Sequence, residues 1–287
     1  MPAPVVLAAL SPVEMAAVTV PLALFLLLTE TAVGSYVTTE ALRFRGGLTP
    51  GFLKFMAATC AILAGLGLLV CLAAPVTAYH DVLTLNRGSA TLLPAISALA
   101  TASFVAVSIA AFRGATAGWL RLFALLVVAA ELVDLAVTFA PLGSTWWGAA
   151  TVGATIMLST AVLGTATTGM LLGHWYLVTP ALTNRPLLRS ITWLLVALAG
   201  QAVAFLIALA GLPQGAGSPA PPLLQNPILA ILWALGAVAL PLLAAGLALP
   251  ACRLRSFMSA TGLLYLAMIA IFPGELVGQL LLFTAAR

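Results

Sequence analysis

The chain has 287 residues, of which 63% are hydrophobic and only 6% are charged, and its mean hydropathy is +1.19. This composition excludes a soluble globular protein, and the chain lacks the alternating ten-residue segments of a transmembrane β-barrel. The net charge of +4 comes from basic residues dispersed among loops, which argues against nucleic-acid binding. We therefore expect an all-α polytopic membrane protein that forms one integral membrane domain over residues 1–287.

Eight apolar stretches are each long enough to cross the hydrocarbon core of a bilayer as a helix. In chain order, the predicted spans are approximately 16–42, 51–74, 91–112, 118–141, 147–172, 188–212, 227–250 and 257–283. Short polar or Pro/Gly-rich segments separate them, and none of these segments is long enough to fold as a soluble domain.

The basic residues predict the orientation of the spans, because Lys and Arg accumulate in cytoplasmic connections. Nine of the eleven lie in or beside alternate connections on one side, namely Arg43, Arg45, Lys54, Arg113, Arg121, Arg185, Arg189, Arg253 and Arg255. Only Arg87 and Arg287 fall on the other side. We therefore expect both termini to lie on the non-cytoplasmic side of the membrane.

Four carboxyl side chains fall well inside the predicted spans, away from the span ends, where a charged group costs about 3 kcal/mol on insertion scales. They are Glu30, Glu131, Asp134 and Glu275. Glu131 and Asp134 are three residues apart and should share one helix face. The four acids are candidates for a proton path from the bilayer centre to the external surface, which Gln201 and Gln279 could extend. Alternatively, each acid makes a single hydrogen bond to a neighbouring helix.

The connection after the second span concentrates groups that could bind a quinone head group. A quinone carbonyl needs hydrogen-bond donors, and a group that exchanges protons near neutral pH would serve its redox chemistry. The candidates within this stretch are Tyr79, His80, Asp81, Asn86 and Arg87. The alternative is a structured surface loop with a simple His–Asp contact.

Haem and metal sites are not expected in this chain. His80 and His174, which are the two histidines, fall on opposite membrane faces about 30 Å apart and cannot ligate one haem together. A haem with another axial ligand is the alternative. The cysteines Cys60, Cys71 and Cys252 form no CxxC or Cys/His cluster, so we interpret them as small apolar core residues.

Three stretches together resemble a known family of membrane subunits. They are LFLLLTETAVGSYVTTEAL in the first span, AAPVTAYHDVLTLNRGSA after the second, and GELVGQLLLF in the last. With eight spans and external termini, they resemble the membrane subunits of the NrfD/polysulfide reductase and dimethyl sulfoxide reductase anchor superfamily. The last stretch carries Gln279 where the anchors usually have Arg.

The resemblance implies a quinone-reactive membrane anchor within a respiratory oxidoreductase complex of the bacterial cytoplasmic membrane. Such a subunit contains no haem, binds menaquinone or ubiquinone near the external face, and exchanges electrons with an iron–sulfur protein beside a catalytic or cytochrome subunit. Tyr79, His80, Asp81 and Asn86 would then face the quinone. Glu30, Glu131 and Asp134 would lead protons towards the cytoplasm. The alternatives are a proton-coupled secondary transporter and a purely structural subunit of a complex.

Overall fold

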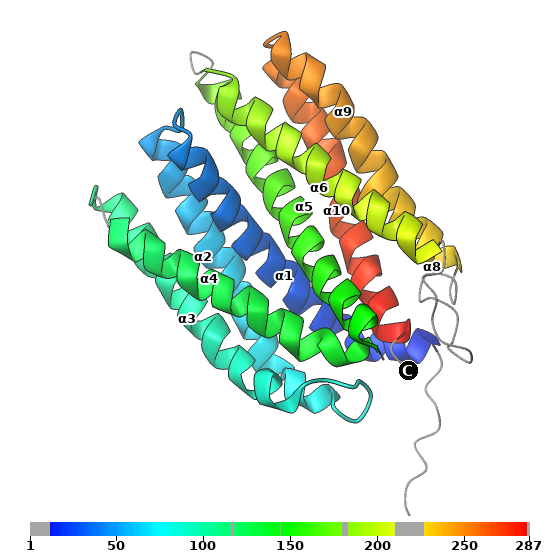
Figure 1. Cartoon of the computed structure of the whole chain (residues 1–287). Coiled ribbons are helices and arrows are strands. Elements are labelled where there is room, and N and C mark those ends of the chain that lie inside the picture. The colour runs from blue at the N-terminus through cyan, green and yellow to red at the C-terminus, as the bar shows by residue number, and fades with distance from the viewer. Residues whose placement is uncertain (1–11, 116–117, 144, 180–182, 210–226, 286–287) are drawn as a thin grey trace, which may run out of the picture.

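The structure, a computed structural model, describes residues 12–115, 118–143, 145–179, 183–209 and 227–285. Within these ranges all regular secondary structure is helical, and eight helical segments are long and apolar enough to cross a membrane (Figure 1). The predicted fold class is therefore confirmed.

Six long helices form the first six crossings: α1 (Pro12–Phe44), α2 (Pro50–Ala73), α3 (Arg87–Phe112), α4 (Gly118–Phe139), α5 (Trp146–Val178) and α6 (Arg185–Leu209). The seventh crossing consists of α8 (Pro227–Trp233), the π-helix η3 (Ala234–Ala239) and α9 (Leu240–Arg253), and the eighth is α10 (Phe257–Ala285). The short 3₁₀ helices η1 (Val76–Tyr79) and η2 (Ala140–Leu142) lie in connections.

Side-chain caps explain where several helices begin. The Thr49 hydroxyl accepts a hydrogen bond from the backbone N–H of Phe52, and the Thr145 hydroxyl accepts one from Gly148. Each cap satisfies a backbone donor that has no partner inside the helix. Several helices run a turn or more beyond the predicted apolar spans. The fifth, for example, continues past residue 172 to Val178, since polar residues can extend a helix outside the hydrocarbon layer.

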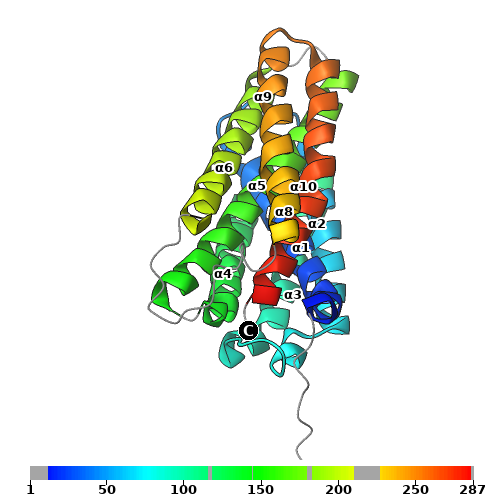
Figure 2. The same ribbon diagram turned by 90° about the vertical axis from the view of Figure 1, so that its right-hand side faces the viewer.

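The helix α1 is the central element of the bundle. It packs against α2 on one side and against α5 and α10 on the other. The helix α3 packs against α2, α4 packs against α3 and α5, and α6 and α9 lie beyond α5 and α10 (Figures 1 and 2). In an 18-residue window of the α1 span, 61% of the window is buried inside the protein, whereas the corresponding share in the other spans is 28–50%. A helix in this position can carry polar side chains that lipid would not tolerate.

The nine basic residues singled out above all lie at one end of the bundle, which we call the basic end. They occur around the connections α1–α2, α3–α4, α5–α6 and α9–α10. The opposite end carries the connection from α2 to α3, the start of α1 and the end of α10 (Figure 1). The assignment of the basic end to the cytoplasm stays a prediction from the positive-inside rule.

Glycines allow α1 and α5 to touch through their backbones. A Cβ atom on Gly34 would lie 2.0 Å from the carbonyl oxygen of Thr160, and one on Gly164 would lie 2.1 Å from the carbonyl carbon of Gly34. Neither backbone can retreat without moving its whole helix. This contact therefore sets the distance between the two helices.

We expect Gly164→Ala to lower the free energy of unfolding by about 1–3 kcal/mol, because the added methyl group must separate α1 from α5. Thermal unfolding of the detergent-purified protein measures the effect. The control is Gly246→Ala in α9, where an added Cβ meets nothing within 4 Å. Equal unfolding midpoints for the two variants would contradict the proposed role of this crossing.

Candidate functional site

A cavity of about 150 Å³ lies between α1, α5, α6, α8 and α10. Thr151, in the second turn of α5, lines it, so the cavity occupies the half of the bundle away from the basic end. Most of its wall is apolar, including Leu26, Ile156, Leu158, Ala204, Trp233, Leu281 and Leu282. Its buried polar lining consists of Glu30, Ser159, Gln201, Glu275 and Gln279. We call it the polar cavity.

Glu30 is held from two neighbouring helices. The Ser159 hydroxyl on α5 donates a hydrogen bond to Glu30 Oε2 at 2.6 Å, and Gln279 Nε2 on α10 donates to the same oxygen at 2.9 Å. The side chain is only 1% exposed, so these donors take the place of water. The two bonds converge on one oxygen and hold this side of the carboxyl group at the cavity wall.

Glu275 forms a second, similar pair across the cavity. Gln201 Nε2 on α6 donates to Glu275 Oε1 at 2.7 Å, and Glu275 lies close enough to Glu30 for their negative charges to repel each other. No Lys or Arg lines the cavity to neutralise them. The site therefore favours a ligand that brings protons or hydrogen-bond donors.

The two glutamines each leave one amide oxygen unpaired beside the cavity. Each amide directs its NH₂ group towards a carboxyl oxygen, and the opposite oxygen atoms, Gln201 Oε1 and Gln279 Oε1, are buried without a partner in the described structure. Buried amide oxygens are normally paired. Both atoms are closed off from water, so the polar groups that remain for a ligand are the carboxyl groups of the lining.

Glu131 and Asp134 form a separate group between α3 and α4. Both are buried on the same face of α4, as their spacing predicts. The Ser97 hydroxyl donates to Glu131 Oε1 at 2.7 Å, whereas Glu131 Oε2 and Asp134 Oδ2 are buried without a partner in the ranges described. Across those ranges, no hydrogen bond links this group to the acids of the polar cavity. The four acids thus lie in two groups rather than in one hydrogen-bonded ladder.

Two of the quinone candidates in the α2–α3 connection have clear structural contacts. Tyr79 is buried in the core, and burial raises the pKa of its phenol, which therefore stays protonated at neutral pH. The Asn86 side chain caps α3 by accepting a hydrogen bond from Ser89 N at 3.2 Å. The backbone N–H of Asn86 donates to the Thr138 carbonyl at 3.0 Å.

The remaining candidates there have no side-chain hydrogen bond or ion pair in the described structure. His80 is half-buried, whereas Asp81 and Arg87 are exposed. The described structure contains no hydrogen bond or ion pair between His80 and Asp81, and none of the five candidates lines the polar cavity. Quinone binding by this connection stays a prediction.

Sequence reasoning missed the serines that hold the acids. Ser159 lies in a span rich in Gly, Ala, Ser and Thr, where a hydroxyl is an ordinary helix-packing group. Its pairing with Glu30 joins residues 129 positions apart and depends on how α1 and α5 cross. The free cysteines, by contrast, are buried as expected.

Comparison with protein-family models, with curated proteins and with solved structures found no match. Membership of the NrfD-like superfamily therefore stays a prediction from three sequence motifs.

We expect Ser159→Ala to lower the free energy of unfolding by about 1–3 kcal/mol, because it removes a hydrogen bond to a buried carboxyl group. The matched control is Ser103→Ala, which is also buried but donates only to the Ala100 carbonyl of its own helix. Thermal unfolding of both purified variants makes the comparison. A loss no larger than that of the control would show that Ser159 does not anchor Glu30.

Proposed function

We propose that this chain is the membrane anchor and quinone-reactive subunit of a bacterial respiratory oxidoreductase complex, and that the quinone binds in the polar cavity. One observation carries the proposal. A mostly apolar cavity within the membrane has two carboxyl–carboxamide pairs, from α1, α6 and α10, in its wall.

The chemistry of a quinone complements this lining. The ring and isoprenoid tail are apolar and suit Leu26, Trp233 and Leu282. In the reduced form, two hydroxyl groups donate hydrogen bonds, for which the lining offers the carboxyl groups of Glu30 and Glu275. These contacts support the choice of a quinone over a fully apolar ligand.

The carboxyl groups would handle the protons of the reaction. Oxidation of a quinol releases two electrons and two protons, and its reversal takes them up. Glu30 and Glu275 lie in the cavity wall, where each can accept or return one proton by general acid–base catalysis. Glu131 and Asp134 remain candidates for a separate proton path through α4.

The electrons would pass to or from an iron–sulfur protein at the end of the bundle opposite the basic end, with a catalytic or cytochrome subunit beyond it. The polar cavity lies in that half of the bundle, so the distance to such a partner would be short. In this proposal the partner docks at the non-cytoplasmic face, as the resemblance implies.

A proton-coupled secondary transporter is the second candidate. It is favoured by the seventh crossing, in which the π-helix η3 interrupts the α-helix next to the cavity. A Cβ on Gly274 would lie only 2.3 Å from Ala237 N of this π-helix, so the irregular segment packs directly beside Glu275. Transporters often place substrate at interrupted helices.

We expect the protein purified from native membranes to carry a quinone together with an iron–sulfur subunit, both detectable by mass spectrometry. Gln279→Leu removes an amide group from the cavity wall, and Glu275→Gln keeps an acceptor for Gln201 but removes the second carboxyl oxygen that could accept from the quinone. Each should reduce the bound quinone about tenfold, the effect of losing one buried hydrogen bond.

Glu131→Gln is the matched control, because it makes the same change in the other buried acid group and should leave the quinone content unchanged. Undiminished quinone in Gln279→Leu and Glu275→Gln would contradict a site in the cavity. Purification without quinone or redox partner, together with proton flux in liposomes that Glu275→Gln abolishes, would favour the transporter.

A further inference from the structure

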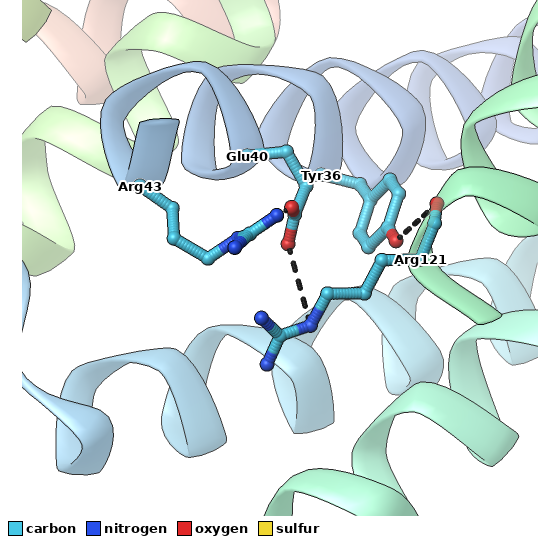
Figure 3. Close-up of polar contacts among 4 residues, drawn as sticks. All are labelled: Tyr36, Glu40, Arg43 and Arg121. Carbon is cyan, nitrogen blue, oxygen red and sulfur yellow. Dashed lines mark hydrogen bonds and ion pairs between the residues drawn. The ribbon is translucent and has the colours of Figure 1, made fainter. Parts of the chain in front are cut away.

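A buried carboxylate organises two arginines at the basic end. Glu40, one turn before the end of α1, has only 6% of its side chain exposed. Arg43 Nε donates to Glu40 Oε2 at 2.7 Å, and Arg121 Nε of α4 lies 3.9 Å from Glu40 Oε1 (Figure 3). The arginine side chains are 27% and 20% exposed, so the carboxylate anchors two groups that reach the surface.

A hydrogen bond to the backbone of α4 also joins α1 to α4 beside this group. The Tyr36 hydroxyl, one turn before Glu40, donates to the Arg121 carbonyl at 3.2 Å and joins α1 to the first turns of α4 (Figure 3). A cavity of about 10 Å³ lies beside these residues, which is room for one water molecule at most. Any larger ligand of the arginines must therefore bind on their outer side.

The outer side of the arginines offers unused donors. Arg121 directs its terminal nitrogens away from Glu40 (Figure 3). Within the described ranges, no hydrogen bond or ion pair engages the terminal nitrogens of Arg43 or Arg121. Two positive charges face one negative charge, so the group retains one uncompensated positive charge. Planar guanidinium groups with free terminal N–H donors match the oxygens of a phosphate.

The depth of the pair determines which phosphate it meets. Arg43 is the second-to-last residue of α1, and Arg121 is the fourth residue of α4. Both therefore lie where a spanning helix leaves the hydrocarbon layer. Phe44 and Trp119, beside them in sequence, are 72% and 75% exposed, which is typical of aromatic side chains at the membrane interface. A group at this level contacts lipid head groups.

We propose that Arg43 and Arg121, positioned by Glu40, form a binding site for the phosphate of an anionic phospholipid. Glu40 holds the Nε side of each arginine, and the phosphate oxygens accept hydrogen bonds from the terminal nitrogens. The site lies on α1 and α4 at the basic end and does not depend on the function of the polar cavity. Basic pockets between helices are a common form of specific lipid recognition.

The test uses the full chain in detergent, titrated with phosphatidylglycerol and observed by native mass spectrometry. The unmodified protein should bind one phosphatidylglycerol saturably, in preference to phosphatidylcholine. Arg43→Gln and Arg121→Gln should each weaken the binding about tenfold, through loss of a charge-assisted contact. Arg253→Gln, an exposed arginine at the same end, should not. Equal weakening in all three variants, or equal binding of phosphatidylcholine, would overturn the proposal.

Substitution of Glu40 distinguishes a lipid site with positioned arginines from a diffuse basic surface. Glu40→Gln removes a negative charge, so a diffuse surface would bind the anionic lipid more tightly. A site that depends on Glu40 to position its arginines would bind it several-fold more weakly. Tighter binding therefore contradicts the proposal.

Arg121→Lys serves where Glu40→Gln does not fold. It keeps the charge but loses the planar donor group. The proposal therefore requires weaker lipid binding, whereas a diffuse basic surface would bind the lipid as before. Inorganic phosphate identifies the source of the ligand. If millimolar inorganic phosphate displaces the phospholipid, the site recognises a soluble anion and the assignment to a lipid is wrong.

Discussion

A carboxyl group within a hydrocarbon layer has to find its hydrogen-bond partners inside the protein, and this constraint organises the bundle around α1. Glu30 of this helix takes its partners from α5 and α10, while Glu40 takes its partners from α4 and from its own last turn. A helix with such side chains along its length must be surrounded by protein. The close contact at Gly34 and Gly164 then brings the α5 partner within reach.

The seventh and eighth crossings show how backbone irregularity can serve a side chain. The helix α10 continues through Pro273, and it is the facing segment, η3, that departs from the α-helical pattern. The wider turn of η3 packs against Gly274, where a side chain would not fit. Glu275 therefore lies beside a rigid backbone contact, which helps to keep its carboxyl group in place at the cavity wall.

Much of this architecture could be predicted from the sequence, because hydropathy and helix length are local properties. The eight crossings and the grouping of basic residues at one end follow from them. So does the shared face of Glu131 and Asp134, which three-residue spacing determines. The pairing of Glu30 with Ser159 and of Glu275 with Gln201 could not be predicted, since it depends on which helices are neighbours. Eight apolar helices of similar character allow many arrangements, and only side-chain packing selects one. The π-helix could not be predicted either, because the sequence ALGAVA is equally compatible with an ordinary α-helix.

The two bonds to Glu30 have a consequence for how the bundle responds to a proton. Ser159 and Gln279 both donate to Oε2, so a proton can reside on Oε1 while both donors keep their acceptor. Glu30 can thus change its charge without releasing α5 or α10. In a carrier, loading and unloading of a proton has to alter the way helices hold one another, because the change of shape moves the cargo. The geometry around Glu30 instead suits a residue that exchanges protons within a stationary scaffold, as a catalytic group does.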